Sequence, residues 1–297
     1  MKRIYITLGR RVEIEGQDEK DRGDLVVVDW DSKNIEYISL IGRYEVENGK
    51  SRGCSGLDFF EDKLFVASRT DLIALNPDTL KEDYRVNLTP PYGVHQIKAY
   101  NDILWVACMR RNMKQAVKNG RVIDVVPTRY SGIDSNNKPS GCFNSIAWSP
   151  NEDEYHMYTG PEEIYNFSKK EIVTKGKLGT SPHDLCFLNN RELLFTRSIA
   201  RELVLLDIET KKMDVVFSLP VENNIDDWGF VGFMRGIEYD FISDSVFIMT
   251  GPGTLWQLSR KDWNVIDKLV FYEGATERQK KERCPFDILL DPRDWRA

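Results

Sequence analysis

A repeated four-part unit constrains the fold of this chain more than any other feature. The clearest copy, Ser181–Phe217, holds four short apolar runs separated by turn-forming residues. These runs are His183–Leu188, Glu192–Thr196, Glu202–Asp207 and Met213–Phe217. Asn189-Asn190 tolerate left-handed turn conformations, and the polar segment that begins at Asp207 is typical of a hairpin tip. The unit therefore predicts a four-stranded antiparallel sheet.

The opening strand of this unit recurs along the chain with matching strands behind it. Aligning His183 with the other copies selects Ser55, His95, Asn144 and Arg235. Successive copies lie 39 to 52 residues apart, close to the roughly 40 to 50 residues of propeller repeats. A single sheet cannot bury both of its faces, so the copies are expected to pack around a common axis.

The first copy lacks an opening strand, and the C-terminus supplies one. Arg3–Leu8, Asp24–Asp29 and Ile35–Leu40 match the second, third and fourth strands, whereas Phe286–Leu290 has the form of an opening strand. Pairing the two ends removes exposed sheet edges. The chain is predicted to be all-β: one six-bladed β-propeller domain over residues 1–297, with four-stranded antiparallel blades and a C-terminal strand that completes the N-terminal blade.

Turn-forming residues mark the hairpins inside the blades. Asn76-Pro77-Asp78 and Lys118-Asn119-Gly120 are predicted hairpin turns. The polar stretch Gly274–Arg283 is expected to form a turn or two of helix before the closing strand.

Composition and charge exclude several classes of protein. Hydrophobic residues make up 41% of the chain and charged residues 30%, as in a soluble globular protein. No apolar run approaches the roughly 20 residues of a membrane span, and Ile4–Leu8 is too short for a signal-peptide core, so a cytoplasmic location is expected. The formal charge of −6 makes nucleic acid a poor default partner. Five cysteines without a CxxC pair indicate reduced thiols.

Three segments carry a family resemblance. SLP...GFMRGIEY within Ser218–Tyr239, VFYEGATE...FDILLDP within Val270–Pro292 and the SPHDLCF opening resemble the signatures of a family of uncharacterised bacterial six-bladed propeller proteins. The family's lines read approximately LPGFLRGL, FEG followed by DVxxLP, and MPHSP, and this chain departs from the last after Pro182-His183. The resemblance implies the fold and its closure, and no activity. A more distant similarity links the chain to gluconolactonase-like and strictosidine-synthase-like propellers, but fold alone does not transfer function.

The aligned position of each inner strand is expected to line one end of the central channel. In blade order this ring consists of Phe286, Ser55, His95, Asn144, His183 and Arg235. Its last four members form an arc of two imidazoles, an amide and a guanidinium. The arc predicts a site for a small anionic, carbohydrate-like ligand, in which Arg235 binds a carboxylate or phosphate and His95 and His183 are candidate catalytic acids or bases. The alternative is that these side chains fill the channel with hydrogen bonds and water.

Loop residues extend the predicted ligand site. Arg110 and Arg197 follow second strands and should emerge on the same face as the ring, where arginines attract an anionic solute. Trp228 lies in the loop Ser218–Gly232, which together with the loop Thr128–Gly141 is a candidate lid.

The ring contains no carboxylate, and a cationic Arg235 beside His183 opposes a divalent ion, so neither a metal nor another cofactor is assigned. Asp184 and Asp287 lie one residue further along their strands and, on a two-residue period, are expected to face the blade packing. Three functions remain open: ligand binding with or without turnover, a protein-interaction platform without catalysis, and a metal-dependent hydrolase or lyase. The expected partner is a small ligand or another protein, with neither nucleic acid nor membrane.

Overall fold

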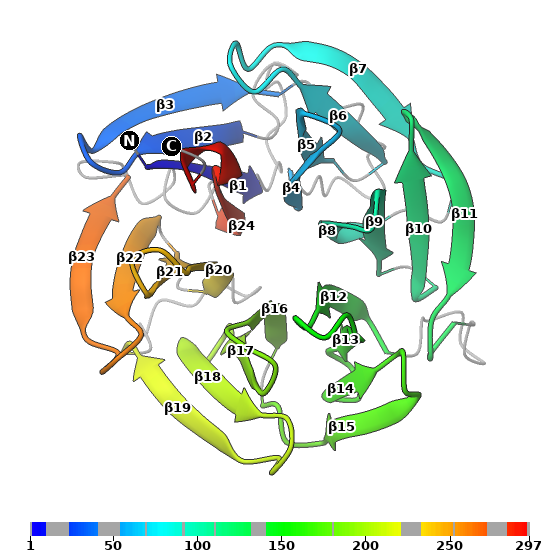
Figure 1. Cartoon of the computed structure of the whole chain (residues 1–297), viewed down its shortest axis with the longest axis vertical. Helices are drawn as coiled ribbons and strands as arrows, with labels where there is room; N and C mark the ends of the chain where they lie inside the picture. Colours follow the sequence, from blue (N-terminus) through cyan, green and yellow to red (C-terminus); the bar gives the residue numbers. More distant parts are fainter. Residues whose placement is uncertain are drawn as a thin grey trace, which may run out of the picture.

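Six four-stranded antiparallel sheets stand around a central axis, as the repeats predict (Figure 1). The computed structural model describes residues 2–9, 24–40, 54–68, 70–90, 93–109, 111–131, 141–179, 181–220, 233–251, 253–271 and 284–295. In five sheets the strands follow one another along the chain, and in the sheet near the N-terminus the last strand of the chain lies innermost. The fold is a six-bladed β-propeller.

Each blade runs from an inner strand at the axis to an outer strand at the rim. Blade 1 contains β24 (Cys284–Leu290), β1 (Arg3–Gly9), β2 (Asp24–Asp29) and β3 (Asn34–Ser39). Blade 2 contains β4 (Leu57–Phe60), β5 (Lys63–Ala67), β6 (Asp71–Leu75) and β7 (Glu82–Asn87). Blade 3 contains β8 (Val94–Tyr100), β9 (Ile103–Cys108), β10 (Met113–Lys118) and β11 (Arg121–Pro127). Blade 4 contains β12 (Phe143–Trp148), β13 (Glu154–Tyr158), β14 (Glu163–Asn166) and β15 (Glu171–Lys175). Blade 5 contains β16 (Pro182–Phe187), β17 (Glu192–Arg197), β18 (Glu202–Asp207) and β19 (Met213–Ser218). Blade 6 contains β20 (Met234–Asp240), β21 (Ser245–Thr250), β22 (Thr254–Ser259) and β23 (Val265–Val270). The 3-10 helix η2 (Pro292–Trp295) follows β24.

The predicted hairpin turns have the backbone that their residues favour. Asn119 and Gly120 have φ values of 50° and 67°, the left-handed pair of a tight β-hairpin turn. The Asn76 side-chain oxygen accepts hydrogen bonds from the backbone N–H groups of Asp78 and Thr79, both at 3.0 Å, and so holds the β6–β7 turn. The predicted helical stretch Gly274–Arg283 lies outside the described residues.

The hydrophobic core is divided among the junctions between blades. Six buried clusters occupy the six junctions, one in each. Between blades 6 and 1, for example, Val26 and Val28 of β2 belong to the same cluster as Phe247 and Met249 of β21. Each sheet therefore buries both faces only when it has a neighbour on either side.

The pairing of β24 with β1 closes the ring as the sequence predicts. The two strands run antiparallel, with Ile4 opposite Leu290, Tyr5 opposite Leu289 and Ile6 opposite Ile288. All of these side chains are buried. The C-terminal strand thus supplies the inner strand that blade 1 otherwise lacks.

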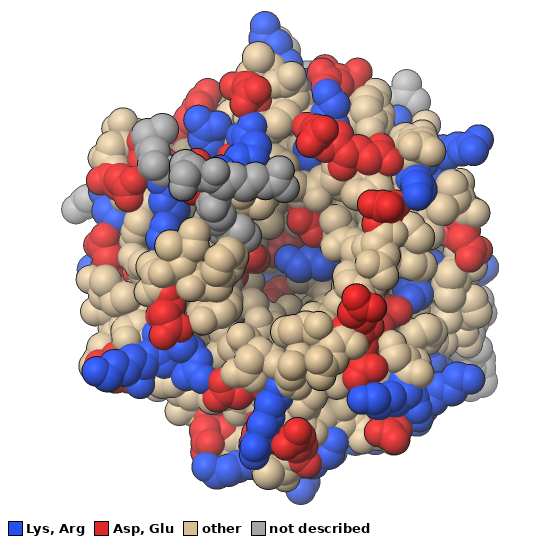
Figure 2. All heavy atoms as spheres, viewed as in Figure 1, with Lys and Arg blue, Asp and Glu red and all other residues tan. Residues whose placement is uncertain are grey.

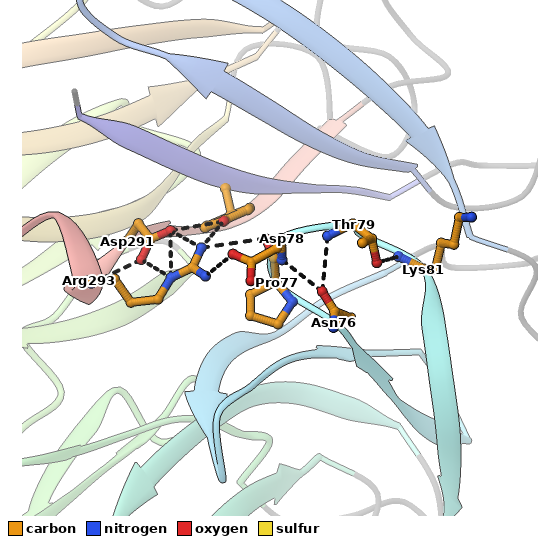
Figure 3. A network of polar contacts seen from close by, with 8 residues as sticks. Asn76, Pro77, Asp78, Thr79, Lys81, Asp291 and Arg293 are labelled. Carbon is orange, nitrogen blue, oxygen red and sulfur yellow. Dashed lines mark hydrogen bonds and ion pairs between the residues drawn. The ribbon is translucent and has the colours of Figure 1, made fainter.

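A polar network beyond β24 reinforces this closure (Figure 3). Arg293 donates to the buried Asp291 carboxylate through Nε and Nη2, at 2.9 and 2.6 Å. Its Nη1 reaches Asp78 of blade 2 at 2.7 Å. The Tyr5 hydroxyl of β1 donates to Asp291 at 3.0 Å. The segment after the closing strand is therefore bonded to blades 1 and 2 together.

We predict that Arg293→Ala lowers the free energy of unfolding by about 1–3 kcal/mol, because it removes charge-assisted hydrogen bonds to a buried carboxylate. Urea denaturation followed by tryptophan fluorescence measures the change. Arg191→Ala is the control, since Arg191 pairs with Asp207 at 2.7 Å but is half exposed. Its expected cost is below about 1 kcal/mol. Equal losses in the two variants would show that the network adds nothing to closure.

Every inner strand carries one extra residue where it enters the blade. In β8, for example, Val94 pairs with Cys108 and Gln96 with Ala107, so two steps along β8 match one step along β9. Equivalent register shifts occur in β12, β16, β20 and β24. Ahead of β4, Ser55 and Gly56 both hydrogen-bond to the backbone of Ala67. This is a β-bulge, which re-aims side chains locally.

The residue after each ring position joins its blade to the next one. At four junctions its side chain accepts a backbone N–H from the neighbouring inner strand: Ile146 N to Gln96, Leu185 N to Ser145, Gly236 N to Asp184 and Leu57 N to Asp287, at 2.9 to 3.1 Å. At the other two junctions the residue is Gly56 or Gly236. A Cβ on Gly56 would lie 2.6 Å from Ile97 N, so the backbones meet directly there. Asp184 and Asp287 thus serve the blade packing, as their position in the repeat predicts.

Gly236→Ala and Gly176→Ala form a matched pair that tests these contacts, because both glycines have φ of 67°. A Cβ on Gly236 would lie 2.9 Å from Ile288 Cγ2 of the next blade, whereas one on Gly176 meets nothing within 4 Å. Both variants pay about 1–2 kcal/mol for the left-handed backbone. We predict that Gly236→Ala loses about 1–3 kcal/mol more, as overpacked sites do. The free energy of unfolding is measured for both variants. Equal values would contradict a close contact between blades at Gly236.

Candidate functional site

The inner strands begin at one end of the axial hollow, which we call the mouth, and run along the channel behind it. Viewed down the axis, acidic and basic side chains are visible inside this hollow (Figure 2). The six ring residues lie at the mouth ends of the inner strands or, for Ser55, just before β4. Ser55, Asn144, His183 and Arg235 are at most 6% exposed.

His183 is held in one orientation at the mouth. Its Nδ1 lies 2.8 Å from the Ser181 carbonyl oxygen and 3.0 Å from the Ser198 hydroxyl. A carbonyl only accepts hydrogen bonds, so Nδ1 carries the hydrogen and Nε2 is left as an acceptor. Asn144 Nδ2 donates to this Nε2 at 3.1 Å. The His95 ring stacks on the His183 ring with centroids 5.6 Å apart and planes 21° apart. The structure thus brings both predicted histidines and Asn144 together.

Two buried polar atoms of the ring lack partners. Asn144 uses its amide nitrogen for His183 and Thr159, whereas its Oδ1 and the Ser55 Oγ make no hydrogen bond within the described part of the chain. Burying such a group unpaired costs about 1–3 kcal/mol. A ligand that brings hydrogen-bond donors to the mouth would recover this cost, and a hydroxyl-bearing molecule has them.

Arg235 places a positive charge on the remaining side of the ring. Its guanidinium lies 4.9 Å from the Phe286 ring centroid and 5.7 Å from that of Phe233. Its charge also opposes the burial that raises the pKa of Asp184. Phe286, the aromatic member of the ring, therefore supports the guanidinium, which cation–π contact stabilises.

A second layer of inner-strand residues follows the ring, three positions further along each strand: Asp58, Lys98, Ala147, Cys186, Glu238 and Leu289. Ala147 and Leu289 of this layer belong to apolar clusters between blades. Lys98 of β8 and Glu238 of β20 come from opposite blades, and their charged atoms are 3.8 Å apart. They therefore meet across the axis. At two paired steps of about 3.3 Å each, this layer lies about 7 Å below the ring.

Burial governs the charges of this layer and those of Asp184 and Asp287, which lie two residues before it on their strands. It raises the pKa of Asp58, Asp184, Asp287 and Glu238, and the pKa of Glu238 reaches about 7 although Lys98 opposes the shift. Burial alone would lower the pKa of Lys98, but the carboxylates of Glu238, Asp58 and Asp287 outweigh it and raise that pKa. Lys98 therefore stays charged, while Glu238 exchanges its proton near neutral pH.

The sequence did not lead to Lys98 and Glu238, although both residues occupy the same aligned position of the repeat, three residues after the ring. On a strict two-residue period, the third residue after the ring faces away from the axis. The bulge adds one residue to each inner strand and reverses that alternation. Signs of the bulge in the sequence are the glycines at positions 56 and 236, directly after ring residues.

One loop residue of the predicted site, Arg197, is bonded within its own blade. Arg197 donates to the Leu178 carbonyl at 2.8 Å and to Glu202 at 2.9 Å, so its guanidinium serves blade 5. Arg110 and Trp228 lie outside the described residues, as do most of the two candidate lid loops. Ligand binding by these residues stays a prediction.

The third histidine and the described cysteines lie outside the ring. His156 is fully buried, with Nδ1 3.0 Å from the Tyr158 hydroxyl and Nε2 2.5 Å from Glu154, which also pairs with Lys114. Cys108 and Cys186 are free thiols. Burial raises the pKa of Cys108 and Cys186 to about 12, so both stay protonated at neutral pH.

Within the described ranges, no group of three or more His, Cys, Asp or Glu side chains is arranged to hold a metal ion. No helix in the same part of the chain is long and apolar enough to cross a membrane.

Comparison with known proteins places the fold but no family. No protein-family model and no curated protein matches the sequence. A protein of unknown function from Bacteroides caccae is 14% identical, with a TM-score of 0.64 over 98% of this chain and 99% of that one. The periplasmic gluconolactonase of Pseudomonas aeruginosa is 13% identical, with a TM-score of 0.55 over 92% and 84%. The β-propeller domain of Myceliophteria thermophila Cps50 (Swd1) is 14% identical, with a TM-score of 0.52 over 89% and 88%. At these identities the likeness shows the propeller fold alone.

We predict that Ser55→Ala raises the free energy of unfolding by up to about 1 kcal/mol, because it removes a buried hydroxyl without a partner. Ser145→Ala is the matched control, since the Ser145 hydroxyl donates to Gln96 at 2.6 Å and accepts from Leu185 N at 2.9 Å. That variant should lose about 1–3 kcal/mol. Thermal and urea unfolding compare the two. A loss of stability in Ser55→Ala would mean that its hydroxyl is already satisfied.

Proposed function

We propose that the mouth of the channel binds a small monoanionic sugar acid. The observation that carries this proposal is the ring itself, in which the unpaired Ser55 Oγ and Asn144 Oδ1 lie with the Arg235 guanidinium and the oriented His183. Hydroxyl groups of the ligand satisfy the two unpaired atoms, and its carboxylate pairs with Arg235. His95 accepts or donates a further hydrogen bond, and His95 and His183 are candidate acids or bases.

The charges below the ring favour one negative charge over two. Four carboxyl groups and two cations share the channel, and a ligand adds its own charge to them. Two like charges about 7 Å apart repel by about 2 kcal/mol at an effective dielectric constant of about 20. A phosphosugar dianion therefore meets this repulsion twice and a carboxylate meets it once, while either anion pairs with Arg235.

The comparisons support a ligand-binding or an interaction role only in general terms. One propeller of similar fold is a gluconolactonase, which fits a sugar-acid ligand, and others are propeller domains such as the WD40 domain of Doa1. A protein-interaction platform is thus the second candidate. One observation favours it: Phe241 and Ile242, at the tip of the β20–β21 hairpin away from the mouth, are 59% and 60% exposed. Substitutions there leave the ring intact and so separate the two functions.

We predict that D-gluconate and D-glucuronate bind the wild-type protein more tightly than D-glucose or D-glucose 6-phosphate does. Arg235→Gln should weaken binding of the two acids about 10- to 100-fold, the effect of losing a charge-assisted pair. Isothermal titration calorimetry and thermal shift measure the affinities.

Arg260→Gln is the control, because Arg260 stands 4.9 Å from the Trp263 ring in the same blade but pairs with Glu192, away from the mouth. It should bind the acids as the wild type does. A wild-type protein that binds neither acid, or binds them equally after Arg235→Gln, would refute the proposal.

A further inference from the structure

Lys98 and Glu238 form an ion pair with each other, whereas the other carboxylates around them are hydrogen-bonded to the backbone. Asp58 accepts the N–H groups of Phe59 and Ala99, Asp184 accepts that of Gly236, and Asp287 accepts those of Leu57 and Ile288. Neither the Lys98 ammonium nor the Glu238 carboxyl makes a hydrogen bond to any described residue. Their 3.8 Å separation is also longer than a hydrogen bond.

Both groups face the hollow although protein surrounds them. The Lys98 side chain is 28% exposed and that of Glu238 is 15% exposed. The two side chains come from inner strands of opposite blades and meet across the axis, so this surface belongs to the axial channel. Three N–H donors and a carboxyl group are therefore available to a molecule that reaches below the ring.

We propose that Glu238 is a general base, and Lys98 its electrostatic partner, for a proton transfer on the carbonyl end of a uronic acid in its open-chain form. This inference rests on the proposed function, because it needs the acid's carboxylate at Arg235. A six-carbon chain of five bonds of about 1.5 Å spans about 6 Å, close to the roughly 7 Å between the two layers. The aldehyde of a uronate bound at the mouth thus falls at the Lys98–Glu238 level.

The step balances without a co-reactant. The Glu238 carboxylate takes the proton from C2, the C2–H electron pair forms a C1=C2 double bond, and the carbonyl electrons move to O1. The negative charge on O1 is stabilised by the Lys98 ammonium 3.8 Å from Glu238. Glu238 then returns the proton to C1 while the C2 hydroxyl proton passes to O1 and O2 becomes the carbonyl oxygen. Alternatively, the enediolate turns over, Glu238 returns the proton to the opposite face of C2, and the C1 carbonyl re-forms. The products are a keto acid or the C2 epimer, with all atoms conserved.

The protonation of Glu238 suits this role. The charged groups that act on its carboxyl are Asp58 from β4 and Lys98 from β8, and the carboxyl in turn acts on the Cys186 thiol from β16. Asp184 from β16 and Asp287 from β24 interact with Lys98. Burial first, and then Asp58, raises the pKa of Glu238 to about 7 against the opposing effect of Lys98. A base with a pKa near the working pH is both available and strong enough to take a proton. The rate should therefore rise with pH up to about 7 and level off above it.

The test is exchange of the C2 hydrogen of D-glucuronate and D-galacturonate in D2O, followed by proton NMR in the presence of a chelator. The wild-type protein should catalyse the exchange, and Glu238→Gln should slow it at least about 100-fold while binding glucuronate within about threefold of the wild-type affinity. Glu192→Gln, at a glutamate that pairs with Arg260 away from the channel, should exchange as the wild type does. Lys98→Met should slow the exchange comparably, and if it does not fold, Glu238→Gln decides alone.

The outcomes distinguish this inference from the proposed function. Glucuronate that binds without wild-type exchange, or exchanges equally in Glu238→Gln, overturns the base role and leaves sugar-acid binding standing. Failure of every sugar acid to bind overturns both. A further check needs no ligand: the Glu238 carboxyl of the wild-type protein is titrated by 13C NMR, and its signal is identified by its absence in Glu238→Gln. A midpoint near the ordinary glutamate value of about 4.3 would also overturn the base role.

Discussion

The pairing of β24 with β1 is the interaction on which the rest of the structure depends. It joins segments almost a whole chain apart, and closing such a loop costs about 5 kcal/mol of chain entropy beyond a constant. The antiparallel ladder, the apolar cluster between blades 6 and 1 and the bonds of Arg293 to Asp291 and Asp78 offset that cost. The closing strand also delivers Phe286 and Asp287 to the channel. The contact of Arg235 with Phe286 crosses the closing junction, so the candidate site is complete only in the closed ring.

The architecture was predictable because its determinants are local and repeated. In the Ser181 unit, predicted and observed strands agree within one residue at each end. Closure was predictable because one blade lacked an inner strand and the C-terminus had a spare one. The hydrogen bonds of Arg293 could not be predicted. They join the C-terminal segment to a turn more than two hundred residues earlier, and no periodic pattern in the sequence marks such a contact.

The candidate site was predictable in its first layer and not in its second, for one geometric reason. Aligning the repeats identifies residues in equivalent places, and these residues form the ring. In the structure, His183 of the ring contacts Asn144 and His95. Deciding which neighbours share its face requires counting along the strand, and the bulge changes that count. Without the bulge, a strict two-residue period puts Lys98 and Glu238 on the face away from the axis. A one-residue irregularity present in all six inner strands therefore decides which side chains reach the axis.

The bulge also explains how one short strand serves both packing and a polar channel. Its extra residue aims the side chain after the ring at the next blade, where Gln96, Ser145, Asp184 and Asp287 each accept a backbone N–H. For these groups, the hydrogen bonds that hold the blades together offset the free-energy cost of burying a polar side chain. Ser55 Oγ and Asn144 Oδ1 at the mouth, and Lys98 and Glu238 below it, have no such compensation among the described residues. Polar groups without a hydrogen bond to the described residues, at two levels of one hollow, are the features that support placing the proposed ligand site at the axis.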